Sequence, residues 1–306
     1  MAASDESNFF IAILRPWENL ANLVLYFMGA GLANYLALNT NWQVLWLGFI
    51  LMTAILIGGS ALAGCYKQMG AGTSLKRTFS NTLPGTQQTT ERRKLVNCLA
   101  LVVGGFGIAL ILTFQLSRFS SLNPQVYIFI AIAIVLNILY GIHPIKLLER
   151  GMGEFVLAVT GAFLFPVVAF LLQSGELNRL LVFTTLPLTI FYLAMELTRS
   201  LRPFSLNPSR YRQNSLVGRI GPERGLSLII YLVLAGYILA AIEGVFGLSF
   251  QVLWRMLISL PIGLFLVWQL HRVRGGAKPN WKALEISAIA LVIFPAYFIS
   301  ILFWTS

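Results

Sequence analysis

The sequence carries little charge for its length and contains a single aspartate. Only 11% of its 306 residues are charged, whereas soluble domains usually carry about 25%. This shortage excludes a soluble enzyme. The 57% hydrophobic share excludes a disordered chain. Barrel strands alternate apolar and polar residues, whereas the apolar stretches here are continuous. We therefore expect an all-α integral membrane protein.

Several chemical motifs are also missing. The two cysteines, Cys65 and Cys98, have no metal-ligand spacing, and we expect both to be buried apolar side chains. No Gly-rich phosphate loop, Ser-His-Asp set, zinc spacing or haem motif occurs. Residues 1–8 are polar and acidic, without the basic region of a signal peptide. The sequence thus offers no support for the common soluble enzyme classes.

Nine apolar stretches are long enough to cross a membrane, since about 20 apolar residues span the hydrocarbon core. Asn123 followed by Pro124 begins one of them, as an N-cap with proline at the first helical position. Gly221 followed by Pro222 begins another in the same way. We therefore predict about nine transmembrane helices. They cover approximately residues 18–38, 43–66, 95–116, 125–142, 154–173, 179–198, 225–245, 250–270 and 284–303.

The net charge of +11 follows the predicted topology. With the N-terminus in the cytoplasm, all of the 22 Lys and Arg residues except Arg118, Arg179 and Arg255 fall on the cytoplasmic side. Cytoplasmic loops carry such a basic excess. We therefore expect a cytoplasmic N-terminus and a C-terminus on the opposite side. This placement accounts for the basic charge without nucleic acid as a partner.

Two cytoplasmic loops, approximately 67–94 and 199–224, are long, and each carries six basic residues. They lie four helices apart, and long loops at matched positions often mark a binding site. We interpret residues 1–306 as one membrane domain. It has two four-helix-like halves, approximately 14–122 and 123–245, followed by helices 250–270 and 284–303.

Five short motifs occur in a fixed order along the chain. They are Leu14-Arg-Pro-Trp17, Asn81-Thr-Leu-Pro84, Tyr140-Gly-Ile-His-Pro-Ile-Lys146, Gly151-Met-Gly-Glu154 and Asn214-Ser-Leu-Val-Gly-Arg-Ile-Gly221. Each motif is weak alone. Their order and spacing together resemble the UbiA superfamily of intramembrane prenyltransferases, over about residues 14 to 300. The resemblance implies a UbiA-like bundle of nine helices.

The resemblance also implies an activity. Members of this family transfer a polyprenyl group from its diphosphate to an aromatic ring or a lipid headgroup. Two Asp-rich motifs, one in each long cytoplasmic loop, hold Mg²⁺ ions that neutralise the leaving diphosphate. In this sequence the first motif region, 64–80, contains no acid, and the second, 196–211, contains only Glu196. The single aspartate is Asp5, so the family's Mg²⁺ ligands are missing from both motif regions. Glu196 is the one candidate metal ligand that remains there.

Basic side chains are therefore the candidates for binding diphosphate, because arginine binds phosphate without a metal. The diphosphate candidates are Lys76, Arg77, Lys146, Arg199, Arg202, Arg210, Arg212 and Arg219. The candidates for a polar cavity are Tyr140, Glu154, Glu196 and Asn214. The alternative for the basic residues is anchoring at anionic headgroups. The alternative for Glu196 is an ion pair with Arg199 at the end of the helix. The alternative for Glu154 is a favourable contact with the dipole of the helix that it begins.

Two function classes remain open. The first is a divergent prenyltransferase that acts on a polyprenyl diphosphate. The second is a catalytically degenerate relative, a pseudoenzyme, that binds an isoprenoid, quinone or pigment tail or serves as a subunit of a membrane complex. The partners expected in either case are membrane lipid and an isoprenoid lipid. A transporter has less support, since no broken helix with paired polar groups is evident.

Overall fold

The computed structural model describes residues 16–70, 85–119, 123–142, 147, 148, 150–206 and 215–305, with backbone only for 66–70 and 85–95. Throughout these residues the regular elements are all helices. Eight spans are long and apolar enough to cross a membrane. A further helix, α2 (Pro16–Tyr35), has 20 residues, which is about 30 Å, and packs among them. The predicted all-α membrane architecture is confirmed.

The remaining elements follow the predicted order closely. Their bounds are α3 (Trp42–Gly70), α5 (Gly85–Phe119), α6 (Pro124–Gly141), α7 (Gly153–Ala158), the π-helix η1 (Val159–Leu164), α8 (Phe165–Ser174), α9 (Arg179–Leu206), α11 (Leu216–Ile220), α12 (Pro222–Val245), α13 (Phe250–Leu257), α14 (Leu260–Arg274) and α15 (Trp281–Thr305). The predicted cap of α6 is confirmed, because the Asn123 side chain accepts a hydrogen bond from the backbone N–H of Gln125. Proline also begins α12, as predicted.

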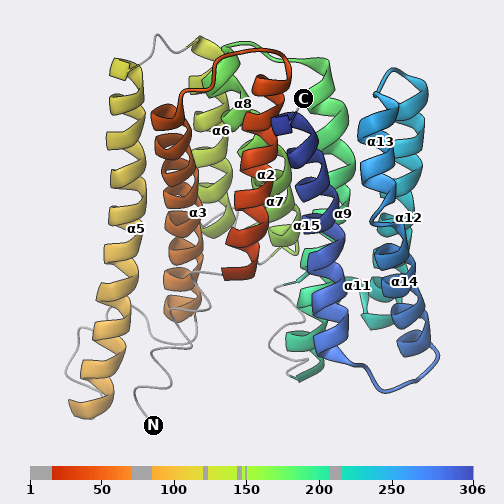
Figure 1. Cartoon of the computed structure of the whole chain (residues 1–306). Helices are drawn as coiled ribbons and strands as arrows, with labels where there is room; N and C mark the ends of the chain where they lie inside the picture. Colours follow the sequence, from red (N-terminus) through yellow and green to blue (C-terminus); the bar gives the residue numbers. More distant parts are fainter. Residues whose placement is uncertain are drawn as a thin grey trace.

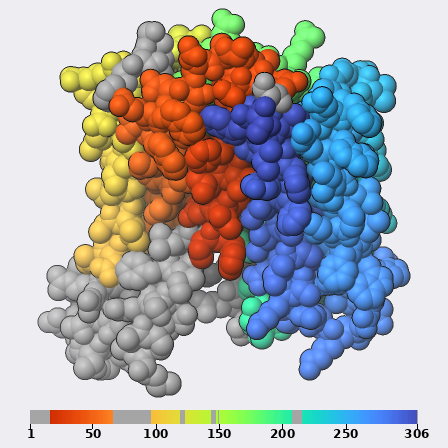
Figure 2. All heavy atoms as spheres, viewed as in Figure 1, coloured from red at the N-terminus to blue at the C-terminus, as the bar shows by residue number. Residues whose placement is uncertain are grey.

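The helices run side by side, and α2 begins at the end of the bundle opposite to the end at which α15 finishes (Figure 1). In this bundle α2 packs against α8 and α15, and Figure 2 shows α2 and α15 in contact along one face. Helix α5 lies at one edge and packs mainly on α3. Helices α12, α13 and α14 form the opposite edge. The ends of α3 and α9 and the starts of α5 and α12 lie at the same end of the bundle, where the two long loops were predicted.

Small residues allow the central helices to approach each other closely. A Cβ atom at Gly29 of α2 would lie 2.2 Å from the carbonyl oxygen of Pro166 in α8. Between α3 and α5, a Cβ atom at Gly105 would lie 2.9 Å from the Cα atom of Gly58. Membrane helices associate through such close packing, because the hydrophobic effect does not drive association between helices that are already surrounded by hydrocarbon.

The fifth span is interrupted by a π-helix. Helices α7, η1 and α8 form one continuous span in which the backbone widens from Val159 to Leu164. Tyr192 of α9 donates a hydrogen bond to the Asn22 Oδ1 atom of α2, with 3.0 Å between the oxygens. A Cβ atom at Gly161 would lie 2.5 Å from that same Asn22 oxygen. The glycine in η1 therefore allows three helices to meet around one buried hydrogen bond.

Replacing Tyr192 with phenylalanine should lower the free energy of unfolding by about 1 kcal/mol, because the buried Asn22 amide loses this donor. Thermal unfolding in detergent measures the effect. Tyr231→Phe is the matched control, since Tyr231 is 67% exposed on α12 and should change little. Equal shifts in the two variants would contradict a structural role for the Tyr192 hydroxyl.

The predicted ranges differ from the helices in three places. Helix α5 begins at Gly85 and α9 ends at Leu206, so both extend beyond their apolar stretches with polar turns. The predicted helix 250–270 is two helices within one span, because the chain turns at Ile258 and Ser259 before α14 begins at Leu260. A short helix, α11, also precedes α12. The division into two four-helix-like halves remains a prediction.

Candidate functional site

The described candidate residues gather at one end of the bundle, where α2, α7 and α15 begin and α9 ends (Figure 1). These residues are Tyr140, Glu154, Glu196, Arg199, Arg202 and Arg219. The other candidates, Lys76, Arg77, Lys146, Arg210, Arg212 and Asn214, lie outside the described residues. The described candidates divide into two groups, which we call the α7–α11 corner and the α2–α9–α15 ion cluster.

The α7–α11 corner consists of Tyr140, Gly151, Gly153, Glu154, Ser215, Leu216 and Arg219. Its buried carboxylate, Glu154, lies in the first turn of α7 and accepts a hydrogen bond from the Leu216 backbone N–H at 3.4 Å. Ser215 caps the same short helix, with its hydroxyl accepting from the Gly218 N–H at 3.0 Å. Glu154 therefore holds the start of α11 against α7, in addition to complementing the positive end of its own helix.

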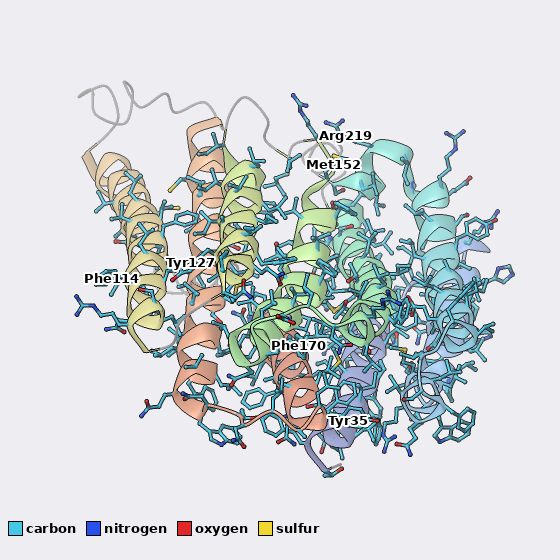
Figure 3. All side chains as sticks on the ribbon, turned by 90° about the horizontal axis from the view of Figure 1, so that it is seen from above. Tyr35, Phe114, Tyr127, Met152, Phe170 and Arg219 are labelled. Atoms are coloured by element: carbon cyan, nitrogen blue, oxygen red, sulfur yellow. The ribbon has the colours of Figure 1, made fainter. Side chains whose placement is uncertain are left out.

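This attachment places Arg219 over the start of α7. A Cβ atom at Gly151 would lie 3.0 Å from the Arg219 Cδ atom, so the arginine stem packs on a glycine whose φ is +74°. Figure 3 shows Arg219 beside Met152, the residue that precedes α7. On the other side of this turn, a Cβ atom at Gly153 would lie 3.1 Å from the Tyr140 ring. The two glycines predicted as a motif thus bring Tyr140, Glu154 and Arg219 together.

The α2–α9–α15 ion cluster consists of Glu18, Glu196, Arg199, Arg202 and Glu285. The Arg199 guanidinium is hydrogen-bonded to the Glu18 carboxylate. It also lies 3.7 Å from the Glu196 carboxylate and 3.7 Å from that of Glu285. Arg202 lies 3.9 Å from Glu285 on the more exposed side. Helices α2, α9 and α15 are therefore joined by charge at this end.

The cluster contains the ion pair that was the alternative interpretation of Glu196. The predicted ion pair three residues apart is present, and Glu18 and Glu285 add two further carboxylates to it. Among the described residues of this cluster, three carboxylates face two guanidiniums, so Arg199 and Arg202 both have acidic partners. Arg219, the other described arginine among the candidates, lies in the α7–α11 corner and has an exposed side chain.

Glu18 and Glu285 were not among the predicted site residues. Glu18 is only 3% exposed although it lies in the first turn of α2. One signal was available, because buried carboxylates in membrane segments are rare and usually paired. The chain has only eleven acids, so each acid at a helix end was a candidate partner for a predicted arginine.

The described residues do not fit the family's pair of Mg²⁺ sites. No group of three or more His, Cys, Asp or Glu side chains in the described part of the chain could hold a metal ion. Mg²⁺ requires several carboxylate or water oxygens at short distance. The Glu196 carboxylate, the one acid of the second motif region, faces the Arg199 guanidinium instead.

These features define a class of protein, an intramembrane helical bundle with polar and charged groups at one end. Its fold is the UbiA fold, as the sequence motifs predicted. The chain is similar to a UbiA homologue from Archaeoglobus fulgidus, with a TM-score of 0.62 and 14% identity over 97% of this chain and 99% of the other.

The same homologue bound to GPP and Mg²⁺ gives a TM-score of 0.57 at 14% identity, covering 97% and 99% of the two chains. A structure of digeranylgeranylglyceryl phosphate synthase gives 0.56 at 12% identity, covering 97% and 98%. No family model matches the chain, and no curated protein matches it in sequence. The likeness therefore concerns the fold along nearly the whole chain.

Proposed function

We propose that this protein binds an isoprenoid diphosphate inside the membrane, with the diphosphate at the α7–α11 corner and the prenyl chain among the apolar helices. Structures of the same fold have been solved with GPP and Mg²⁺ and with DMAPP and Mg²⁺. The observation that carries the proposal for this chain is the placement of Arg219. Its side chain is exposed and packed on Gly151, and α11, which carries it, is fixed by Glu154.

An arginine at this position can neutralise diphosphate directly. A guanidinium presents a planar set of donors that bind two phosphate oxygens at once, and it stays charged at every physiological pH. Lys146, next to the corner in sequence, is the second candidate ligand. Prenyl transfer to a lipid or aromatic acceptor is the reaction proposed for such a site, with the basic side chains stabilising the leaving diphosphate as the carbon–oxygen bond breaks.

The ion cluster favours a second candidate function. Glu196 is paired with Arg199 within α9, and Arg199 also pairs with Glu18 of α2 and Glu285 of α15. A protein that keeps the fold and uses this position for stability fits a non-catalytic isoprenoid-binding or assembly subunit. The two candidates share the binding step and differ in turnover.

Binding of geranylgeranyl diphosphate to the purified protein, with Mg²⁺ and with EDTA, tests the proposal. We expect equal affinity in both conditions. Replacing Arg219 or Lys146 with alanine should weaken binding about tenfold or more, because a charge-assisted hydrogen bond contributes about 1.5–3 kcal/mol. Arg272→Ala is the control, since Arg272 lies on α14 over the Trp268 ring.

Unchanged affinity in both the Arg219 and the Lys146 variants would contradict the proposed site. Binding that requires Mg²⁺ would show that a metal participates and would direct attention to Glu196. If wild-type protein binds the diphosphate but releases no pyrophosphate with any acceptor tested, the assembly role gains support. Absence of binding in both conditions would reject the isoprenoid diphosphate as a ligand.

A further inference from the structure

The only two cysteines of the chain lie against each other across α3 and α5. Both are buried, with Cys65 1% and Cys98 0% exposed. The two side chains are close enough to interact with one another. The Cys98 thiol also donates to the Ala61 carbonyl oxygen, with 3.1 Å between sulfur and oxygen. Two residues that are 33 positions apart in sequence therefore share one contact.

The local packing of the two helices supports a covalent link. A Cβ atom at Gly64 would lie 3.6 Å from the Cys98 sulfur, so a glycine leaves room for this sulfur beside Cys65. The close approach at Gly58 and Gly105 holds the same two helices together further along. A disulfide needs Cβ atoms about 3.5–4.5 Å apart and sulfurs about 2.05 Å apart. The Cys98 sulfur lies against the turn of α3 that contains Ala61, Gly64 and Cys65, so side-chain rotation can bring the two sulfurs together.

We propose that Cys65 and Cys98 form a reversible disulfide that joins α3 to α5, with a lipid-soluble quinone as the oxidant. Two S–H bonds break and one S–S bond forms. The two electrons and two protons released reduce the quinone to its quinol, so the reaction is balanced without a further reactant. A dithiol reductant reverses it by thiol–disulfide exchange.

The location of the pair favours an oxidant that dissolves in lipid. In the sequence, Cys65 lies near the end of the apolar stretch 43–66, and Cys98 lies near the start of the apolar stretch 95–116. Helix α5 exposes a broad apolar face that includes Val103 and Phe114, and it packs mainly on α3. The disulfide would therefore fix an edge helix to the bundle.

The test uses the full chain, reduced and incorporated into phosphatidylcholine vesicles, and treated with decylubiquinone. After denaturation in SDS, a polyethylene glycol maleimide counts the free thiols. The reduced protein should take two adducts and the quinone-treated protein none. The treated protein should also be lighter by two hydrogen atoms, and dithiothreitol should restore both adducts.

The Cys98→Ala variant is the matched control, with Cys65→Ser as a second variant in case the first does not fold. A single remaining thiol cannot form the intramolecular bond, so either variant should keep its one adduct after treatment. Two adducts in treated wild-type protein would overturn the proposal. So would loss of the single adduct in a variant, or a mass increase that shows quinone addition to sulfur. The result does not depend on the proposed diphosphate site.

Discussion

Replacing Arg199 with alanine should lower the free energy of unfolding by about 3–5 kcal/mol, because it leaves buried carboxylates without their counter-charge. The Arg199 side chain is 19% exposed, and its partner Glu18 is 4% exposed. The carboxylates of Glu196 and Glu285 lie within 3.7 Å of the same guanidinium. Thermal and denaturant unfolding in detergent measures the loss.

Arg202→Ala provides the control for this prediction. Arg202 is 54% exposed and lies 3.9 Å from Glu285, so its loss should change stability by no more than about 1 kcal/mol. The double variant Glu18→Gln with Arg199→Gln should regain part of the stability, because it removes a carboxylate together with the guanidinium. If Arg199 and Arg202 variants unfold alike, the cluster does not join the three helices.

Replacing Gly29 with alanine should destabilise the protein by about 3 kcal/mol or prevent folding, because the added methyl group meets backbone atoms. The new Cβ atom would lie 2.2 Å from the Pro166 carbonyl oxygen and 2.5 Å from its Cα atom. Rotation of a side chain cannot relieve this contact, so α2 and α8 must separate. The unfolding midpoint and the yield of monodisperse protein measure the effect.

Gly104→Ala is the matched control for Gly29→Ala, since both glycines lie within helices. A Cβ atom at Gly104 meets nothing within 4 Å. Alanine is favoured over glycine in a helix by about 1 kcal/mol, so Gly104→Ala should be neutral or stabilising. Equal loss in the two variants would mean that the α2–α8 contact does not limit stability.

The sequence predicted the order and approximate limits of the membrane-crossing helices, because each needs a long apolar stretch to cross the membrane. It did not predict the polar turns that extend α5 to Gly85 and α9 to Leu206, since helix outside the hydrocarbon region needs no apolar residues. The π-helix η1 was also missed. It contains Gly161, which packs against α2 and α9, and contacts between distant helices leave no local sequence pattern.

The candidate site was predictable where its residues are close in sequence. The pairing of Glu196 with Arg199 follows from their spacing of three on a helix. The Gly151–Glu154 motif likewise indicated Glu154, although its contact with Leu216 depends on how α11 folds back. Glu18 lies 181 residues from Arg199, so only the packing of α2 against its neighbours brings them together.

The packing of α2 between α8 and α15 has a consequence for biogenesis. At a synthesis rate of about 5–20 residues per second, roughly 12–50 s separate the completion of α2 from the arrival of α15 at the ribosome. Throughout this interval one flank of α2, including the Glu18 carboxylate, has no native neighbour from α15 or from Arg199 until α9 is made. Insertion machinery or a chaperone that shields an early helix would meet this need, and closure of the bundle is set by the last helix translated.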